Sequence, residues 1–326
     1  MFLVTGGAGF IGSNLVASLV ADGLEVVVCD RLGTEGKWRN LRSHPPAALV
    51  APEDIHDWLG RHPPLEAIVH LGAVSSTTET DGDLTFHTNV TLSQRLWDWC
   101  AAREVRFVYA SSAATYGDGS AGFDDDAAPA ALAALRPLNL YGWSKHAFDR
   151  WVAHNLAQGR PRPPQWAGLK FFNVYGPNEY HKGSMISVVK VKYDEIAAGR
   201  PARLFRSDRP DIADGEQRRD FVHVDDCVDV MRWLLSAPHV SGLFNLGTGQ
   251  ARSYRDLVHA IFAALDRPPG IEFIDMPAAL RGQYQSFTQA RMDRLRAAGW
   301  PGQSTPLETG VARYVRDFLT QPDPYR

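Results

Sequence analysis

FLVTGGAGFIG, residues 2–12, is the segment of the sequence that is most informative about the fold. Residues 2–5 are typical of a short buried strand, and the apolar residues that continue to position 22 are typical of a helix. Gly6, Gly9 and Gly12 lie three residues apart between them. The first glycine permits a tight turn, the second lets the backbone approach a pyrophosphate, and the third packs the helix on the strand. The stretch therefore predicts a dinucleotide-binding loop with a helix N-terminus facing the phosphates.

An acidic residue marks the end of the next apolar run. Asp30 follows residues 25–29, at the spacing of about 20 residues expected for a carboxylate that bonds the adenosine ribose. Asp30 alone favours the free 2′-hydroxyl of NAD, whereas Arg31 and Lys37 can hold the 2′-phosphate of NADP. We therefore predict a nicotinamide dinucleotide as cofactor, with NADP preferred and NAD as the alternative.

Short apolar runs alternate with amphipathic stretches along the first 172 residues. These segments are 2–5, 10–22, 25–29, 54–60, 67–71, 83–102, 106–110, 141–157 and 167–172. The alternation of strand-like and helix-like segments predicts an α/β fold with a doubly wound parallel Rossmann sheet. After Asn173 the expected elements are a helix near 184–199, a polar loop at 207–217, a strand at 220–224, a helix at 225–236 and a strand at 242–246.

This pattern predicts two structural units. Residues 1–172 and 219–248 are expected to form the dinucleotide-binding domain. Residues 173–218 and 249–326 are expected to form a smaller α/β substrate-binding lobe.

Composition and charge argue against several classes of function. The 326 residues are 44% hydrophobic with a formal net charge of -3, which gives no long-range attraction to nucleic acid or anionic membranes. No apolar run approaches the roughly 18 residues of a membrane span, and the first strand begins almost at Met1, so we expect a cytoplasmic protein. The three cysteines read as free thiols, and the scattered histidines show no ligand spacing, so no metal site is predicted.

A tyrosine and a lysine lie four residues apart, at Tyr141 and Lys145, and therefore on one face of a predicted helix. A nearby cation lowers the pKa of a phenol from its usual value of about 10, so the tyrosine can take a carbinol proton as hydride leaves the carbon. Lys145 can also bind the nicotinamide ribose of the cofactor. Ser111 and Ser112 follow the strand-like run 106–110, where the carboxyl end of a strand opens toward a ligand crevice. A hydroxyl there can hydrogen-bond the substrate oxygen.

The glycine loop, the strand-end serines and the Tyr141/Lys145 pair, in that order, resemble the extended short-chain dehydrogenase/reductase superfamily over the whole chain. Five segments look like those of the ADP-L-glycero-D-manno-heptose 6-epimerase family: AVSSTTE at 73–79, YASSAATYG at 109–117, FNVYGP at 172–177, HKGSM at 181–185 and GQYQSFTQ at 282–289. The first three occur with variations in many sugar-nucleotide epimerases, whereas the last two are more particular.

The resemblance implies an enzyme that inverts C6 of ADP-D-glycero-D-manno-heptose for lipopolysaccharide core assembly and keeps its cofactor bound. It implies that Tyr141 and Lys182 are the two acid/base groups. The residues implied to line the cofactor are Phe10, Ile11, Asp30, Arg31, Lys37, Leu71, Gly72, Ala73, Val74, Ser75 and Val174. Those implied to contact the substrate are Asn173, Ser184, Phe205, Arg219 and Tyr284.

Alternatives stay open for both residues and function. Without the resemblance, Lys182 reads as a solvated loop lysine, Arg219 as a surface arginine and Tyr284 as a packing aromatic. The nearest rival function is a UDP-hexose 4-epimerase, which needs no second base, and a remote one is a non-catalytic dinucleotide-binding module. The expected partner is a nucleotide-sugar, and a homo-oligomer is expected because helices equivalent to 83–102 and 141–157 pair across subunits in the superfamily.

Overall fold

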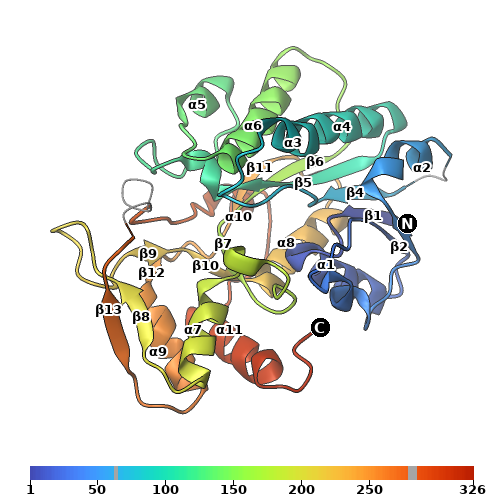
Figure 1. The fold of residues 1–326 in the computed structure, drawn as a ribbon. Helices are drawn as coiled ribbons and strands as arrows, with labels where there is room; N and C mark the ends of the chain where they lie inside the picture. The colour runs from blue at the N-terminus through green and yellow to red at the C-terminus, as the bar shows by residue number, and fades with distance from the viewer. Residues whose placement is uncertain (62–64, 278–284) are drawn as a thin grey trace.

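The computed structural model describes residues 1–61, 65–277 and 285–326. A seven-stranded sheet forms its centre, with the strand order β11-β6-β5-β4-β1-β2-β3 (Figure 1). The strands are β1 (Phe2–Thr5), β2 (Val26–Cys29), β3 (Ala48–Val50), β4 (Ala67–His70), β5 (Arg106–Ser112), β6 (Trp166–Phe171) and β11 (Gly242–Leu246). Every pairing within this sheet is parallel, so the predicted doubly wound α/β fold is confirmed.

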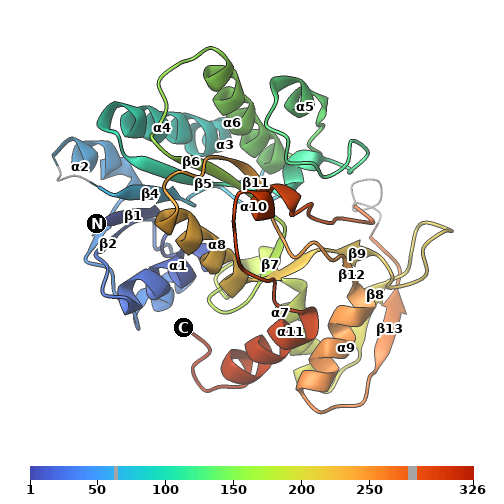
Figure 2. The same ribbon diagram turned by 180° about the vertical axis from the view of Figure 1, so that it is seen from behind.

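Helices cover both faces of this sheet, as Figures 1 and 2 show. One face carries α3 (Gly82–Phe86), α4 (Leu92–Arg103) and α6 (Leu140–Ala157), and the other carries α1 (Phe10–Ala21) and α8 (Val224–Ser236). A π-helical turn at His87–Thr91 joins α3 to α4, so the helix expected over 83–102 is continuous but locally widened. Two shorter helices are α2 (Ile55–Arg61) and α5 (Pro129–Ala134).

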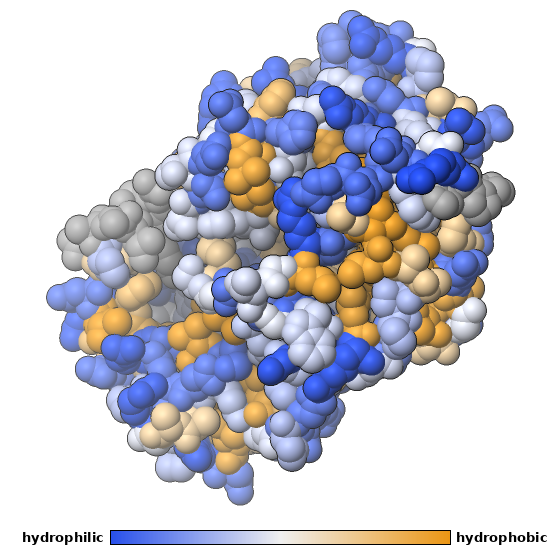
Figure 3. All heavy atoms as spheres, turned by 45° about the vertical axis from the view of Figure 1, so that its right-hand side comes forward, coloured by the Kyte–Doolittle hydropathy of each residue, from blue (hydrophilic) through white to orange (hydrophobic). Residues whose placement is uncertain are grey.

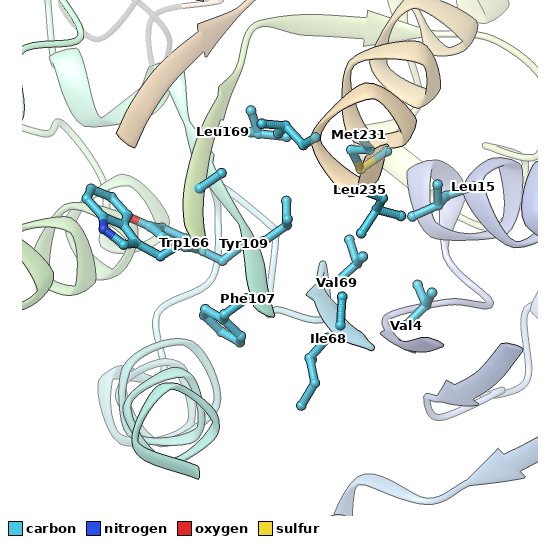
Figure 4. Packing of buried hydrophobic residues seen from close by; sticks show 14 of the residues in the cluster. Val4, Leu15, Ile68, Val69, Phe107, Tyr109, Trp166, Leu169, Met231 and Leu235 are labelled. Atoms are coloured by element: carbon cyan, nitrogen blue, oxygen red, sulfur yellow. The ribbon is translucent and has the colours of Figure 1, made fainter. Parts of the chain in front are cut away.

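The main core lies between the sheet and these helices. The residues of β1, β2 and β4 are all buried, because parallel strands covered on both faces need apolar side chains in both directions. In Figure 4, Val69 lies toward Met231 and Leu235 of α8. Phe107 points to the opposite face, where its ring packs edge-on against Trp97 of α4 at 6.1 Å between centroids. Truncating such a side chain to alanine costs about 3–5 kcal/mol.

A second apolar cluster lies beneath the sheet in Figure 1. It is enclosed by α7 (Val188–Ala197), α9 (Tyr254–Ala264), α11 (Leu307–Tyr314) and the parallel pair β8 (Ala202–Phe205) and β13 (Ile271–Ile274). Two short strand pairs run between the clusters: β7 (Asn173–Tyr175) with β10 (Phe221–His223), and β9 (Arg218–Arg219) with β12 (Arg252–Ser253).

Two segments differ from the division of the chain that the sequence pattern predicts. Of the strands within 219–248, β11 joins the seven-stranded sheet, whereas β10 pairs with β7 in a separate one. Met292, Leu295 and Trp300 pack in the larger core beside β11, although residues 249–326 are predicted to form the lobe. The short helix α10 (Asp293–Ala297) buries Leu295 there, and a single apolar residue in so short a helix carries no periodicity in the sequence.

Charged and polar side chains dominate the face shown in Figure 3, and apolar side chains gather there in separate patches. More than half of the surface of a folded protein is apolar, so such patches do not by themselves mark a site. Within the three described ranges, no helix combines the length and the apolar composition needed to cross a bilayer.

Candidate active site

A cavity of about 500 Å³ opens at the carboxyl ends of the central strands. Its walls come from the glycine loop after β1, the segment after β4, the end of β5, the first turns of α6 and the loop 181–188. The strand order reverses between β1 and β4, and ligands of open α/β sheets bind at such a switch point. The cavity is therefore where this fold is expected to hold a ligand.

The glycine loop fits a dinucleotide phosphate. A Cβ on Gly6, whose φ is +66°, would lie 2.6 Å from the Gly72 nitrogen, and one on Gly12 would lie 2.2 Å from the Gly6 oxygen. These two glycines are required by the turn and by helix packing. A Cβ on Gly9 would meet only the Gly6 oxygen at 3.1 Å and Lys37 Cε at 3.9 Å, so this position keeps the cradle open. No side chain of the described residues caps α1, so its first N–H groups are available to an anion.

Asp30 ties the next strand to this loop. Its Oδ2 accepts a hydrogen bond from the Ala8 backbone nitrogen at 2.9 Å, and its Oδ1 accepts one from Lys37 Nζ at 2.6 Å. Arg31 turns away from the cavity, because its Nε donates to Glu53 Oε1 at 2.8 Å on the surface. Asp30 and Lys37 thus line the cavity, and Arg31 does not.

Tyr141 and Lys145 stand on successive turns of α6. The Asn139 side chain caps this helix by accepting a hydrogen bond from the Gly142 nitrogen at 2.8 Å, which fixes Tyr141 in the first turn. Gly142 allows close packing, since a Cβ there would lie 2.7 Å from the Ala114 oxygen. The strand-end residue Ser112 thereby comes within hydrogen-bond reach of the Tyr141 phenol.

The surroundings shift the pKa values of this pair in known directions. Burial raises the pKa of the Tyr141 phenol, and the hydrogen bond from Ser112 opposes that rise. Burial lowers the pKa of Lys145 to about 8, against the attraction of Asp149, which acts to raise it. Such perturbed pairs in a cleft are typical of proton-transfer sites.

Lys182 lines the same cavity from the loop after β7. Its Nζ lies 5.1 Å from the centre of the Phe10 ring, over the start of α1. Burial lowers the pKa of Lys182, and the nearby Glu179 carboxylate opposes the shift. The alternative interpretation as a solvated loop lysine does not describe this half-buried position.

Most of the predicted site residues meet at this cavity. Those that line it are Gly6, Gly9, Phe10, Ile11, Gly12, Asp30, Lys37, Leu71, Gly72, Ala73, Ser75, Ser111, Ser112, Tyr141, Lys145, Asn173, Val174, Lys182 and Ser184. Arg31, Val74, Phe205 and Arg219 do not line it, and Tyr284 lies outside the described residues. Thr77 and Met185 line it without having been singled out from the sequence. Both belong to segments on which the family resemblance rests, so the resemblance is the signal that could have identified them.

Two of the residues outside the cavity have clear structural surroundings. The Val74 backbone exchanges two hydrogen bonds with the Asn89 side chain, each of 2.8 Å, which anchors the segment 71–75. Arg219 is buried, and its guanidinium lies 5.8 Å from the centre of the Tyr254 ring. It is therefore not a solvated surface arginine.

Comparison with known proteins gives one consistent result. The model of the NAD dependent epimerase/dehydratase family matches residues 2–247. An ADP-L-glycero-D-manno-heptose-6-epimerase of Nitratidesulfovibrio vulgaris is 52% identical over the full length of both chains. The crystal structure of the Helicobacter pylori ADP-L-glycero-D-manno-heptose-6-epimerase superposes with a TM-score of 0.80 at 27% identity, covering 98% of this chain and 96% of that one.

A UDP-glucose 4-epimerase of Thermus thermophilus, solved in complex with NAD, is a more distant neighbour. Its TM-score is 0.73 at 26% identity, with 96% of this chain and 97% of that one covered. The glycine loop, the Tyr141/Lys145 pair, the matched family model and the full-length relatives agree. The chain belongs to the NAD dependent epimerase/dehydratase family and, within it, to the family of the ADP-L-glycero-D-manno-heptose-6-epimerases.

Proposed function

We propose that the protein converts ADP-D-glycero-D-manno-heptose into ADP-L-glycero-D-manno-heptose by inverting C6. One observation carries the proposal: two proton-transfer groups from separate parts of the chain, Tyr141 and Lys182, line one cavity together with the dinucleotide loop. Inverting a carbon from either face needs an acid/base group for each orientation of the substrate. The names of the full-length relatives supply the identity of the sugar nucleotide.

The chemistry follows from the nature of the carbon. C6 bears no acidic proton, so its inversion requires oxidation to a ketone and return of hydride to the other face. A nicotinamide dinucleotide bound at the glycine loop supplies the acceptor and donor of that hydride. Tyr141 takes the hydroxyl proton in one orientation, and Ser112 hydrogen-bonds the same oxygen. Lys145 favours the phenolate by its charge.

Lys182 serves the other orientation of the ketone. A lysine accepts a proton only in its neutral form, and burial lowers the pKa of Lys182 from 10.5, so more of the neutral amine is present near neutral pH than on an exposed lysine. The position of its ammonium over Phe10, beside the dinucleotide loop, supports this role. Asn173 and Ser184 line the cavity nearby and are proposed to contact the substrate. Phe205 and Arg219, which do not line it, and Tyr284, which lies outside the described residues, are proposed as further substrate contacts.

Within a family described as NAD dependent, we propose NADP as the preferred cofactor. Lys37 lines the cavity beside Asp30 and offers an ammonium to a 2′-phosphate. Arg31 adds to this only if its pair with Glu53 opens. Mass spectrometry of the dinucleotide released on denaturing the purified protein tests the preference. Lys37→Met should weaken NADP binding by about tenfold more than NAD binding.

The proposal extends to the assembly and the location of the protein. Phe86 of α3 and Trp143 of α6 are each more than two-fifths exposed, with ring centres 6.3 Å apart, which supports pairing of these helices with a second copy. The three cysteines are buried free thiols, which supports a reducing cytoplasm.

The direct test uses purified protein without added cofactor. Incubation with ADP-D-glycero-D-manno-heptose should give the L-glycero epimer. The configuration at C6 is followed by proton NMR. Failure to convert it, even after NADP or NAD is added, would overturn the substrate assignment. UDP-glucose would then be the next substrate to test, because a UDP-glucose 4-epimerase is a structural neighbour at 26% identity. Lys182 argues against that alternative, because a 4-epimerase needs no second base.

A further inference from the structure

A fully buried ion pair lies behind the wall of the active-site cavity. Lys170 Nζ is 2.9 Å from Asp149 Oδ2, and both side chains are 0% exposed. Neither residue lines the cavity. Taking two charges out of water is costly, so a buried ion pair is weak evidence for stability and calls for another explanation.

The carboxylate of this pair holds one of the two strand-end hydroxyls. Ser111 Oγ donates to Asp149 Oδ2 at 2.6 Å, and the Tyr109 hydroxyl donates to Asp149 Oδ1 at 3.1 Å. The Ser111 hydroxyl is thus turned toward the protein interior. Ser112, the next residue, is the one that faces the Tyr141 phenol.

The ammonium of the pair holds the turn that follows. Lys170 Nζ donates to Thr115 Oγ1 at 2.7 Å, and Thr115 Oγ1 donates to the Ser112 carbonyl at 2.8 Å. Ser112 Oγ in turn accepts from the Ala114 nitrogen at 3.1 Å, at the start of the 3-10 turn 113–116. A chain of short hydrogen bonds therefore runs from the buried lysine to the backbone that presents Ser112.

Asp149 is also aligned with the catalytic helix face. It lies one turn after Lys145 on α6, and Lys145 lies one turn after Tyr141. Its negative charge attracts the Lys145 ammonium and opposes the effect of burial on that amine. The charged and titratable groups that face Asp149 are Lys145, His146, Lys170, Tyr109 and Tyr116.

We propose that the Asp149–Lys170 pair is a positioning element of the active site. The carboxylate turns Ser111 inward and places a negative charge one helical turn from Lys145, and the ammonium, through Thr115, fixes the turn that presents Ser112 to Tyr141. The proposal rests on the proposed roles of Tyr141, Lys145 and Ser112, but not on the identity of the sugar.

The test replaces the pair by a neutral one of similar shape, Asp149→Asn with Lys170→Met. The first readout is the titration of Lys145 followed by NMR of ¹³C-labelled lysine, which needs no substrate. Loss of the carboxylate should move the pKa of Lys145 downward by half a unit or more. The second readout is the pH profile of kcat, where kcat at neutral pH should fall about tenfold and the high-pH limb should move to lower pH.

A matched control pair is available on α7. Lys192 Nζ lies 3.0 Å from Glu195 Oε2, away from the cavity. Glu195→Gln with Lys192→Met should leave the pKa of Lys145 unchanged and kcat within twofold of the parent value. Thr115→Val keeps both buried charges and breaks only the link to Ser112. It should lower kcat severalfold without moving the Lys145 titration, and it keeps the test open if the neutral pair does not fold.

The outcomes separate this proposal from the proposed function. A folded Asp149→Asn/Lys170→Met protein with the parental Lys145 titration and kcat would overturn it. If the Asp149→Asn/Lys170→Met protein does not fold, a Thr115→Val protein with the parental kcat would overturn the proposal instead. A parent protein that fails to convert the heptose would instead overturn the substrate assignment, and the Lys145 titration would still decide the positioning role.

Discussion

Tyr141 and Lys182 lie 41 positions apart in the chain, one on α6 and the other in the loop after β7, yet both line one cavity. If each serves one orientation of the substrate, neither can replace the other. We expect Tyr141→Phe and Lys182→Met each to lower kcat by about 10²–10⁴-fold, the usual contribution of a positioned acid or base. The amount of dinucleotide bound per chain should stay within twofold, measured by absorbance after denaturation. A Lys182→Met enzyme within tenfold of the parent kcat would contradict the two-group scheme.

The surroundings of His70 fix the protonation state of its ring. Its Nε2 lies 2.9 Å from Ser93 Oγ, and its Nδ1 lies 2.7 Å from Thr5 Oγ1. The Ser93 hydroxyl donates to the Asn89 carbonyl at 2.7 Å, so Nε2 must donate to Ser93 and Nδ1 must accept from Thr5. The ring is neutral in this arrangement. Burial, with a smaller effect of Lys145, lowers its pKa from 6.5 to about 3.

This shift predicts acid destabilisation. Below the usual histidine pKa the unfolded chain binds a proton here, whereas the folded ring stays neutral until about pH 3. The free energy of unfolding should therefore fall as the pH drops, by about 1.4 kcal/mol per unit below the unfolded pKa. In urea titrations at pH 7.5 and 5, the stability difference between the parent and His70→Gln should shrink by about 2 kcal/mol at the lower pH. A difference that is equal at both values would contradict the assignment.

Local spacing explains which site residues the sequence could reveal. The glycine loop and the Tyr141/Lys145 pair lie within one element or one turn, so their geometry follows from helix and strand periods. Asp149 and Lys170 stand on α6 and β6, and only the tertiary fold brings them together. The burial of Arg219 over Tyr254 likewise depends on the pairing of β9 with β12, two strands of two residues each.

At the scale of elements, the join between β1 and α1 gives a prediction with an internal control. A methyl group at Gly9 meets only the Gly6 oxygen, at 3.1 Å, and Lys37 Cε, whereas one at Gly12 meets the Gly6 oxygen at 2.2 Å. Gly9→Ala should therefore fold normally and weaken dinucleotide binding by tenfold or more, because it fills the phosphate cradle. Gly12→Ala should instead lower the melting temperature. Titration calorimetry with NADP and thermal unfolding distinguish the two, and normal binding by Gly9→Ala would contradict the assigned cradle.

Most long elements were predictable from the sequence and most short ones were not, although α9, with 11 residues, was not predicted. Strands of the central parallel sheet are buried on both faces, so they appear as apolar runs, and α1, α6 and α8 agree with their predicted ranges within a few residues. β7, β9 and β12 have two or three residues, too few for any periodicity. β3 was not predicted for the same reason, since Ala48–Val50 is short and partly exposed at the edge of the sheet. β10 is equally short but lies within the strand predicted at 220–224.

At the scale of the whole molecule, one buried carboxylate joins segments that are far apart in sequence. Asp220 accepts hydrogen bonds from the Thr248 nitrogen and hydroxyl, both at 2.7 Å, and from the Gly249 and Ala290 nitrogens, both at 2.9 Å. It thereby ties the start of β10 to the segments that follow β11 and precede α10. Asp220 and Thr248 fall in the predicted dinucleotide-binding domain, and Gly249 and Ala290 fall in the predicted lobe, so we expect this carboxylate to help hold the two parts together.

Asp220→Asn should destabilise the protein by about 2–3 kcal/mol. Whichever way the new amide is turned, its NH2 group would face a backbone N–H donor, either that of Thr248 or those of Gly249 and Ala290. Urea unfolding measures the loss, and Asp211→Asn in the exposed polar loop serves as the control, which should stay within about 0.5 kcal/mol. Equal stability of the two variants would show that the junction does not depend on the carboxylate.

In the proposed reaction, C6 is oxidised and reduced within one cavity by the same bound dinucleotide. The most direct measurement uses ADP-D-glycero-D-manno-heptose deuterated at C6, in ordinary water with excess unlabelled NADP and NADPH. The L-glycero product should keep its deuterium at C6, as seen by mass spectrometry and NMR. Replacement of the deuterium by hydrogen from the solvent or from free NADPH would contradict it.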